Sequence, residues 1–444
     1  MSKHSVDYVL RLKLQHRIGQ LARVAQCIAE QGALVGEIAT VADSEELTIR
    51  DFTVETESDV IFDRLKNAVG KLDGVKLLEV IDPVADAHVG GKIRVVAERP
   101  VDQVRALRHV YTPGVARIVR RLQKTPSDAW SLTGIGRTVG VFSNGTRVLG
   151  LGDTGTLASL PVMEGKALLY AQLAGLNAFP LVLDAKTPEK FVEVVMAVAP
   201  SVGGIHLEDI KAPDCFAIED ELSRRLKKPV MHDDQHGTAT ATLAAVINAC
   251  DRVGKDPREL RVGQIGLGAA GSAIALLLLH FRVRDVLVHD LSPAAVARAT
   301  MAGAASVNIE HIMRECDVVI AATGKEGLIP ARLVRKGQII FALSNPKPEI
   351  SPWDALDAGA AIASDGASIN NALAFPGLFM GALHARARSI TKGMLVAAAE
   401  QIASHAEKDA LLPSVLNKKM HEAVASDVQA EAQASGLADT AELS

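Results

Sequence analysis

The sequence is poor in aromatic residues and has little excess charge of either sign. Aromatic residues make up 3% of the 444 residues, so Ala, Val, Leu and Ile side chains must fill the cores. The formal net charge is −4, which argues against binding to nucleic acid or to an anionic membrane surface. The longest apolar run, Ala273–Leu279, is too short to span a bilayer, and the first residues lack the apolar core of a signal peptide. These absences predict a cytoplasmic protein with no nucleic-acid or membrane partner.

Cysteine is also scarce. The four cysteines are scattered along the chain, at Cys27, Cys215, Cys250 and Cys316. They form no CxxC pair and have no histidine at zinc-finger spacing, which excludes the common structural zinc sites. We therefore expect buried thiols in a reducing compartment.

The first 82 residues show the pattern of a small, separate domain. Alternating apolar and polar residues predict strands at 8–14, 34–41, 47–56 and 75–80. Apolar residues spaced three and four apart predict helices around 21–28 and 60–69. The resulting order, β-α-β-β-α-β, is that of a split βαβ sandwich, with two helices on an antiparallel sheet. Asp82-Pro83 marks its end.

This segment resembles an ACT domain, a ligand-sensing module of metabolic enzymes. The resemblance implies a regulatory domain over residues 1–82 that binds a small-molecule effector at the loop His16–Gly19. The loop lacks the acidic residue or proline that the family often carries there, and a purely structural or dimerising module is the alternative. ACT units commonly pair side by side, so the resemblance also implies a homodimer or a larger homo-oligomer.

Residues 261–290 show the pattern of a dinucleotide-binding βαβ unit. Gly266-Leu-Gly268-Ala-Ala-Gly271 fits G-x-G-x-x-G between an apolar strand, 262–265, and an apolar helix, 272–281. Gly266 permits the tight turn, Gly268 lets the backbone approach the pyrophosphate, and Gly271 allows close packing of helix and strand. The helix N-terminus offers free N–H groups to the phosphates. A glycine-rich turn without a nucleotide is the alternative.

Other side chains at strand ends extend this predicted site. Asp290 follows the strand 285–289 at the spacing of a carboxylate that binds the ribose hydroxyls. It would repel a 2′-phosphate, which favours NAD over NADP. Two further apolar strands end near Thr323 and Asn345, and open α/β sheets bind ligands at the carboxyl ends of their strands.

Two apolar strands end in paired carboxylates, at Glu208-Asp209 and at Asp233-Asp234. Two strand ends that carry four carboxylates would repel one another unless a cation or protonation offset their charge. Oxygen ligands suit Mg²⁺ or Mn²⁺. The alternatives are solvated turns or helix caps for each pair, and a Zn²⁺ site that uses the flanking His232 and His236.

Lys166 and Tyr111 are the candidates for proton transfer. Lys166 follows Pro161 and precedes the apolar residues 167–170, so we expect it to open a helix. A cation at a helix N-terminus is disfavoured, which would lower the pKa of the lysine toward that of a base. Tyr111 is one of only three tyrosines and precedes a Pro-Gly turn. A half-buried structural tyrosine is the alternative.

Taken together, these motifs resemble the malic enzymes, and most closely the short bacterial type. The sequence contains, in chain order, YTPGV, TRVLGLGD, PVMEGK, LEDI, HDDQHGTA, GLGAAG, SNP and INNALAFPG. The resemblance covers residues 85–430. It implies an oxidoreductase that converts L-malate to pyruvate and CO₂, reduces NAD, and requires Mg²⁺ or Mn²⁺. The same site would also decarboxylate oxaloacetate.

The resemblance assigns roles to individual positions. It implies Tyr111 as general acid, Lys166 as general base and Asp233 as a carboxylate beside the lysine. The implied metal ligands are Glu208, Asp209 and Asp234. The implied substrate-binding residues are Arg147, Asn345 and Asn371, and the implied cofactor-binding residues are Gly266, Gly268, Ala269, Ala270, Gly271, Asp290, Thr323 and Asn345. Two positions depart from the family pattern, since Asp153 and His206 stand where Asn is more usual.

We therefore expect an α/β protein of four parts. A ferredoxin-like ACT domain spans 1–82, and an α/β substrate domain with the catalytic groups spans 83–237. A Rossmann-like NAD-binding domain spans 238–390, and a helical tail spans 391–444.

In the implied reaction, neutral Lys166 takes the hydroxyl proton of malate as hydride passes to NAD, CO₂ is lost, and Tyr111 protonates the enolate carbon. Arg147 would hold a carboxylate of malate by a bidentate contact. Two alternatives stay open. One is a malolactic reaction, in which retained NADH reduces pyruvate to lactate. The other is a non-catalytic sensor, with an ACT unit fused to a decayed enzyme body.

Overall fold

The computed structural model describes residues 6–148 and 150–438 and divides the chain into two compact units. The first unit runs to Arg94 and the second begins at Val95. Leu149 of the TRVLGLGD motif and residues 439–444 of the predicted tail lie outside the described residues. The predicted boundaries at 82, 237 and 390 stay predictions.

The first unit has the predicted order of elements. These are β1 (Val6–Gln15), α1 (Gln20–Glu30), β2 (Leu34–Asp43), β3 (Leu47–Thr56), α2 (Asp59–Val69), β4 (Val75–Ile81) and α3 (Pro83–His88). The four strands form an antiparallel sheet in the order β2-β3-β1-β4. The predicted β-α-β-β-α-β arrangement is therefore confirmed.

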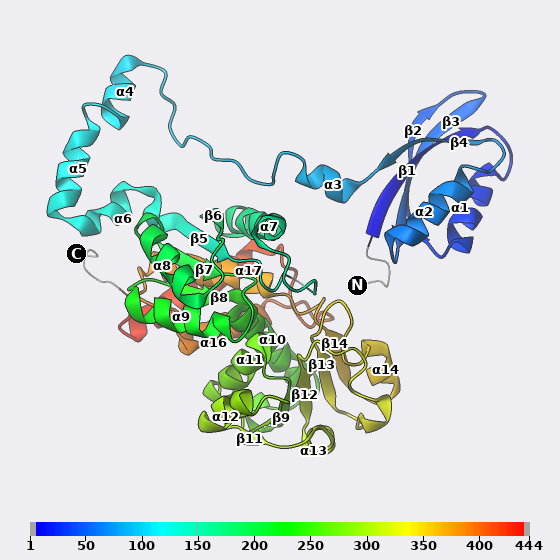
Figure 1. Ribbon diagram of the computed structural model, residues 1–444. Coiled ribbons are helices and arrows are strands. Elements are labelled where there is room, and N and C mark those ends of the chain that lie inside the picture. Colours follow the sequence, from blue (N-terminus) through cyan, green and yellow to red (C-terminus); the bar gives the residue numbers. More distant parts are fainter. Residues whose placement is uncertain (1–5, 149, 439–444) are drawn as a thin grey trace. The chain divides into compact units, whose positions relative to one another are not determined.

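The core of this unit lies between the sheet and its two longer helices (Figure 1). Leu10, Leu12 and Leu14 alternate along β1 and are buried on the same face. Val24 on α1 and Leu65 on α2 are fully buried in the same cluster. The apolar residues of the strands and of the helices thus form one buried layer, which explains why this short segment forms its own unit.

The second unit begins with short helices and a four-stranded sheet. The elements are α4 (Val104–Val110), α5 (Val115–Lys124), α6 (Ala129–Leu132), β5 (Thr138–Ser143), α7 (Thr156–Ala174), β6 (Asn177–Val182), α8 (Pro188–Val198), β7 (Gly204–Leu207), α9 (Asp214–Arg225) and β8 (Val230–His232). The strands are parallel in the order β6-β5-β7-β8. Their carboxyl ends therefore lie along one edge.

Helix α10 (Asp233–Arg252) leads from β8 to a second parallel sheet. Its elements are β9 (Arg261–Ile265), α11 (Ala269–His280), β10 (Asp285–His289), α12 (Pro293–Met301), β11 (Ala305–Ser306), α13 (Ile309–Glu315), β12 (Val318–Ala321), β13 (Ile339–Ala342), α14 (Pro352–Asp357) and β14 (Ile362–Asp365). The strand order β11-β10-β9-β12-β13-β14 is that of a Rossmann-like sheet, whose order reverses between β9 and β12.

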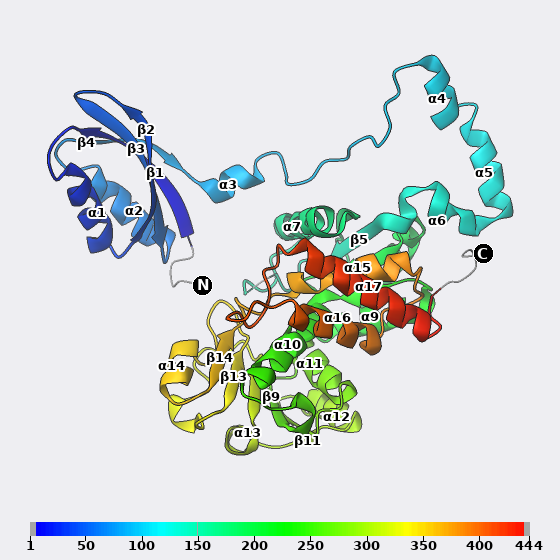
Figure 2. The same ribbon diagram turned by 180° about the vertical axis from the view of Figure 1, so that it is seen from behind.

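The described part of the chain ends with three α-helices, namely α15 (Phe375–His384), α16 (Lys392–Ser404) and α17 (Lys418–Ala434). They pack against one another, and α16 also packs against α10 (Figure 2). Gly381 makes the close approach possible, because a β-carbon there would meet the backbone of Ala425 on α17. Within residues 6–148 and 150–438, no helix combines the length and apolar character needed to cross a membrane.

Candidate functional site

Two neighbouring parallel strands bring the acidic pairs together. Leu207 of β7 pairs with His232 of β8, so the residues that follow each strand leave the sheet side by side. Ligand oxygens of Glu208, Asp209 and Asp234 all lie within 4.8 Å of one another. The expected cluster of carboxylates at this edge is therefore present.

Asp209 adopts an uncommon backbone conformation at this edge. Its φ is +54°, in the left-handed region that residues with a β-carbon rarely adopt. Its N–H group donates a hydrogen bond to Oδ2 of Asp234 over 3.2 Å, and its carbonyl accepts one from the N–H group of Arg147 over 3.1 Å. The Arg147 backbone thus lies beside the carboxylate cluster, while its side chain is exposed.

Lys166 is almost completely buried and contacts three polar side chains. Its Nζ lies 2.6 Å from Oδ2 of Asp233 and 3.0 Å from Oε1 of Glu208. It also donates a hydrogen bond to Oδ1 of Asn371 over 3.2 Å. Four of the residues singled out in the sequence thus share one contact network, although they come from widely separated segments.

The expected cause of a lowered lysine pKa is wrong. Lys166 lies in the middle of α7, which begins at Thr156 and continues through Pro161, so the lysine is far from the helix N-terminus. Burial alone would lower the pKa of Lys166, but the adjacent carboxylates of Asp233 and Glu208 override it and raise the pKa. With only these side chains around it, the lysine holds its proton.

The positive charge around these carboxylates is too small to balance their negative charge. Burial raises the pKa of Glu208 to about 7 and that of Asp233 to about 6, although both contact the Lys166 ammonium group. A divalent cation would supply the missing charge. Because carboxylate oxygens are the ligands that Mg²⁺ and Mn²⁺ prefer, the donor set fits the cation that the sequence implies.

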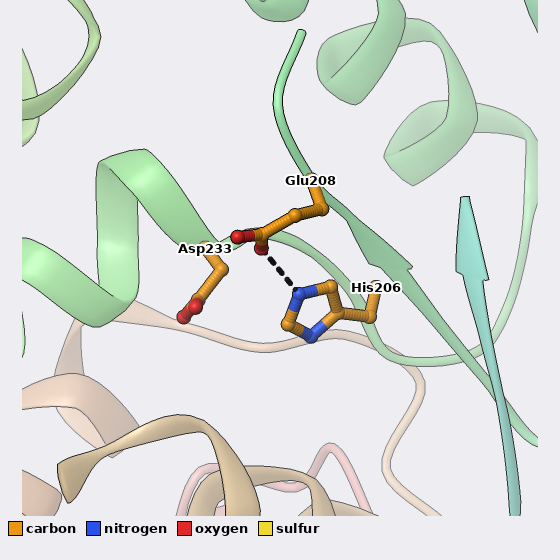
Figure 3. A group of neighbouring side chains, drawn as sticks. All are labelled: His206, Glu208 and Asp233. Atoms are coloured by element: carbon orange, nitrogen blue, oxygen red, sulfur yellow. Dashed lines mark hydrogen bonds and ion pairs between the residues drawn. The ribbon is translucent and has the colours of Figure 1, made fainter. Parts of the chain in front are cut away.

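A second group could also hold a metal ion, and it shares Glu208. Ligand atoms of His206, Glu208 and Asp233 lie within 4.8 Å of one another (Figure 3). Nε2 of His206 lies 2.7 Å from Oε2 of Glu208, and Nδ1 lies 2.8 Å from the hydroxyl of Tyr170. Burial lowers the pKa of His206 to about 4 and raises the pKa of Tyr170, so both side chains are neutral near pH 7.

The two other histidines near this edge have different surroundings. Nε2 of His236 lies 3.1 Å from Oε2 of Glu219, and neither His236 nor His232 belongs to a metal-compatible group among the described residues. Glu219 also accepts hydrogen bonds from the N–H group of His232 and from Gln235. A Zn²⁺ site built on His232 and His236 has no support in this geometry.

Tyr111 is not part of the Lys166 network. It directly follows the last residue of α4, and 64% of its surface is exposed. No residue of α4 or α5 is buried, and both helices expose apolar side chains such as Leu107 and Val119. The structure therefore brings the predicted base and metal ligands together, but it leaves the predicted general acid at the surface.

The glycine-rich loop has the geometry that the sequence predicts. Gly266 has a φ of +86°, and a β-carbon there would lie 2.5 Å from the carbonyl oxygen of Ala322. A β-carbon at Gly271 would collide with the carbonyl of Gly266. Helix α11 begins at Ala269, three residues earlier than expected, so Ala269 and Ala270 form its first turn. Oδ2 of Asp290 accepts a hydrogen bond from the N–H group of Leu267 over 2.6 Å, which places this carboxylate at the loop.

The neighbouring strand ends are joined by a buried carboxylate. Oε1 of Glu349 accepts hydrogen bonds from the N–H and hydroxyl groups of Thr323, over 2.7 and 2.8 Å, and from the hydroxyl of Ser344. Asn345 follows Ser344 and is exposed, and a β-carbon at Gly150 would lie 3.1 Å from its carbonyl oxygen. The substrate-side loop and the Rossmann-side loop therefore meet at Asn345.

Sequence reasoning assigned no role to four buried polar residues, although it noted His206 as a departure from the family pattern. Glu219 and Glu349 each hold several donors at the edges of the site, and Tyr170 and His206 form the hydrogen-bonded line to Glu208. The available signal was weak. Glu219 occupies an apolar-face position of α9, and His206 lies inside an apolar strand, where an unpaired polar group would be costly.

Comparison with protein-family models gives three matches. Residues 90–223 match "Malic enzyme, N-terminal domain", and residues 350–433 match "Malic enzyme, NAD binding domain". Residues 229–326 match "D-isomer specific 2-hydroxyacid dehydrogenase, NAD binding domain".

Individual proteins extend the similarity to nearly the whole chain. NAD-dependent malic enzyme 1 of Bacillus subtilis is 47% identical over 431 residues, covering 97% of this chain and 98% of the relative. The bifunctional malic/malolactic enzyme of the same organism is 39% identical and covers 78% of this chain and 91% of the relative. The crystal structure of malic enzyme from Pyrococcus horikoshii superposes with a TM-score of 0.74 at 37% identity, covering 79% of this chain and 88% of that one.

Proposed function

The chain belongs to the malic enzyme family, and on this premise we propose that it oxidises L-malate to pyruvate and CO₂ with the reduction of NAD. The observation that carries the proposal is the contact network in which Lys166, Asp233 and Glu208 meet beside a three-carboxylate group. A hydride passes from malate to NAD, and one carboxylate leaves as CO₂. The proton lost from the hydroxyl group is balanced by a proton added to the enolate carbon.

We propose that Glu208, Asp209 and Asp234 hold the divalent cation. Glu208 belongs to both groups, but the alternative group also needs Asp233, whose Oδ2 already contacts the Lys166 ammonium group at 2.6 Å. A metal ion there would face a like charge. Asp234 has a side chain that is 34% exposed, so the proposed group is also open to an entering substrate. When bound, the cation supplies Lewis-acid polarisation of the substrate's oxygens and offsets the negative charge that keeps Lys166 protonated.

Lys166 is the proposed base for the hydroxyl proton, and Asp233 receives that proton from it. The two groups are 2.6 Å apart, within reach of direct proton transfer. Asn371 orients the amine from the other side.

Arg147 and Asn345 are proposed to hold the ends of the substrate and the nicotinamide. The Arg147 backbone is fixed to Asp209, and its exposed side chain is free to make a bidentate contact with a malate carboxylate. Asn345 lies where the two loops meet. The pyrophosphate is proposed to bind at Gly266, Gly268 and the first turn of α11. Asp290 is proposed to bind the ribose of NAD, and Thr323 to form the turn beside the cofactor.

We propose a homo-oligomer in which Tyr111 reaches the site of a second copy. Helices α4 and α5 expose Leu107, Val110 and Val119 and bury nothing, so their apolar side chains need cover from another surface. Lys166 lies in a buried network that lacks Tyr111 within one copy. A second copy that packs against α4 and α5 would cover these apolar residues. Tyr111 would then lie at the active site of that second copy.

The first unit is proposed as an ACT-like regulatory domain with an effector at His16–Gly19. Its sheet order supports this proposal, and so does the exposed loop, where Ile18 is fully accessible. A cytoplasmic location is proposed because all four cysteines are free and buried.

Product analysis tests the proposed reaction. Purified protein is incubated with L-malate, Mn²⁺ and NAD, and free NADH, pyruvate, lactate and CO₂ are measured. The proposal predicts NADH, pyruvate and CO₂ in equal amounts. Lactate without free NADH would instead support the malolactic reaction, which is part of the name of the bifunctional relative. The absence of any product would contradict both reactions and favour a non-catalytic sensor.

A further inference from the structure

Three buried side chains form a hydrogen-bonded line that ends on a proposed metal ligand. The hydroxyl of Tyr170 lies 2.8 Å from Nδ1 of His206, and Nε2 of His206 lies 2.7 Å from Oε2 of Glu208. Tyr170 and His206 are completely buried. Tyr170 lies one helical turn after Lys166 on α7, while His206 and Glu208 share a strand end. The line therefore joins the helix that carries the base to the edge that carries the carboxylates.

The imidazole ring has little freedom to turn. Its centroid lies 5.4 Å from that of Phe375 and 5.8 Å from that of Phe379, and Tyr170 contacts both phenyl rings. In this packing the ring presents Nδ1 to Tyr170 and Nε2 to Glu208. The arrangement is suited to orient a partner, because its own position is fixed by packing.

The direction of each hydrogen bond follows from the acceptor at the end of the line. A metal-binding Glu208 is a carboxylate and can only accept, so Nε2 of His206 must carry the proton. A neutral imidazole then has a bare Nδ1, which accepts from the hydroxyl of Tyr170. Tyr170 thereby selects the tautomer of His206 that can donate to Glu208.

We propose that Tyr170 and His206 are positioning residues that hold Glu208 in its metal-binding orientation. The proposal rests on the proposed function, since it takes Glu208 as a cation ligand. Oε2 of Glu208 is held by His206, while Oε1 contacts Lys166 at 3.0 Å, so neither oxygen is free to rotate away. Groups that hydrogen-bond to a ligand fix its direction, and their loss typically weakens metal binding by about 10- to 100-fold.

The test is a direct titration of Mn²⁺ with the full chain, without malate or NAD. Free Mn²⁺ is measured by electron paramagnetic resonance. We expect His206→Leu to raise the Kd for Mn²⁺ by at least ~10-fold. His206→Gln keeps an N–H donor of similar reach. Its Kd for Mn²⁺ should stay within about threefold of the wild-type value, a smaller change than the loss of a strong hydrogen bond would cause.

Tyr170→Phe provides a second, milder variant that keeps the aromatic packing. It removes only the hydroxyl, so the imidazole can adopt the tautomer that does not donate to Glu208. We expect a Kd increase of about 2- to 10-fold, the effect of one hydrogen bond. In the His206→Leu background the same change should have no further effect, because Tyr170 acts through His206.

Matched controls separate this role from general damage. Tyr8→Phe removes a hydroxyl that donates to Asp59 in the first unit, and His421→Leu replaces another buried histidine, on α17. Both should leave the Kd for Mn²⁺ unchanged. If His206→Leu does not fold, Tyr170→Phe and His206→Gln still decide the question by their predicted order.

Two results would overturn the positioning role. One is a folded His206→Leu or Tyr170→Phe variant with a wild-type Kd. The other is a directly bonded nitrogen in the spin-echo spectrum of bound Mn²⁺, which would make His206 a ligand. Wild-type protein that binds no Mn²⁺ would overturn the proposed metal site as well, and is thus distinguishable from a failure of His206 alone.

Discussion

The Nζ atom of Lys166 lies 2.6 Å from Oδ2 of Asp233, and both groups are buried. The pair links the middle of α7 to the first residue of α10, so it fixes the base relative to the metal-binding edge. Gly237 leaves room for this contact, because a β-carbon there would collide with Oδ1 of Asp233. A proton on Lys166 therefore has a defined acceptor.

Loss of the amine should abolish most turnover. Lys166→Met removes the base but keeps an unbranched side chain, and we expect kcat to fall by at least ~100-fold, the low end for general acid–base catalysis. NADH formation under saturating malate, Mn²⁺ and NAD measures the effect. Lys190→Met, on an exposed position of α8, is the matched control and should keep normal turnover. A folded Lys166→Met variant with wild-type kcat would refute the assignment of the base.

The preference for NAD should depend on Asp290. Its carboxylate lies at the glycine-rich loop and would repel a 2′-phosphate. Asp290→Ser removes the charge and keeps a hydrogen-bonding group, so we expect the ratio of kcat/KM for NADP to that for NAD to rise by at least ~10-fold, about 1.4 kcal/mol. Asp285→Ser, at the start of β10, the strand that Asp290 follows, should leave the ratio unchanged. An unchanged ratio in Asp290→Ser would show that another residue selects the cofactor.

Mixing two inactive variants should restore activity if Tyr111 acts across copies. Tyr111→Phe and Lys166→Met are purified separately, then mixed under conditions that exchange subunits. A mixed dimer contains one site with neither change, so we expect up to about half of the activity of wild type per mixed dimer. Two copies of one variant, mixed in the same way, are the control. If Tyr111 acts within its own chain, the mixture stays as inactive as its components.

The ion pair between the partly buried His236 and the buried Glu219 should make the stability of the protein depend on pH. Burial alone would lower the pKa of His236, but Glu219 at 3.1 Å overrides it and raises the pKa above its usual value. A raised folded pKa stabilises the protein fully below the unfolded pKa, and this stabilisation is lost as the pH rises through the folded pKa.

Consequently, His236→Gln should lower the melting temperature more at pH 6 than at pH 9. We expect a difference of roughly 2 °C for a change of about 1 kcal/mol. His384→Gln, at the exposed end of α15, is the control and should show no such difference. The same loss at both pH values would indicate that the pair contributes through packing alone.

Much of the fold and of the metal-binding edge could be predicted because local patterns decide them. Apolar strands that end in Glu208-Asp209 and Asp233-Asp234 had to meet at one edge once the sheet was parallel. Gly266 and Gly271 indicated close backbone contacts, because a β-carbon at either position would collide with a backbone carbonyl.

The environment of Lys166 could not be predicted in the same way. Pro161 suggested a helix start, since proline disrupts helix interiors, yet α7 runs through it and places Lys166 at its centre. The pKa of Lys166 is set by Asp233 and Glu208, which tertiary packing brings from two other elements. For the same reason, no local pattern indicated that His206 and Tyr170 would meet.

Crystals soaked with Mn²⁺ and measured at its absorption edge test the central claim most directly. The account predicts one anomalous peak per site, coordinated by Glu208, Asp209 and Asp234, with the Lys166 amine beside it and outside its ligand shell. A peak coordinated by His206, Glu208 and Asp233, or no peak at this edge, would contradict it.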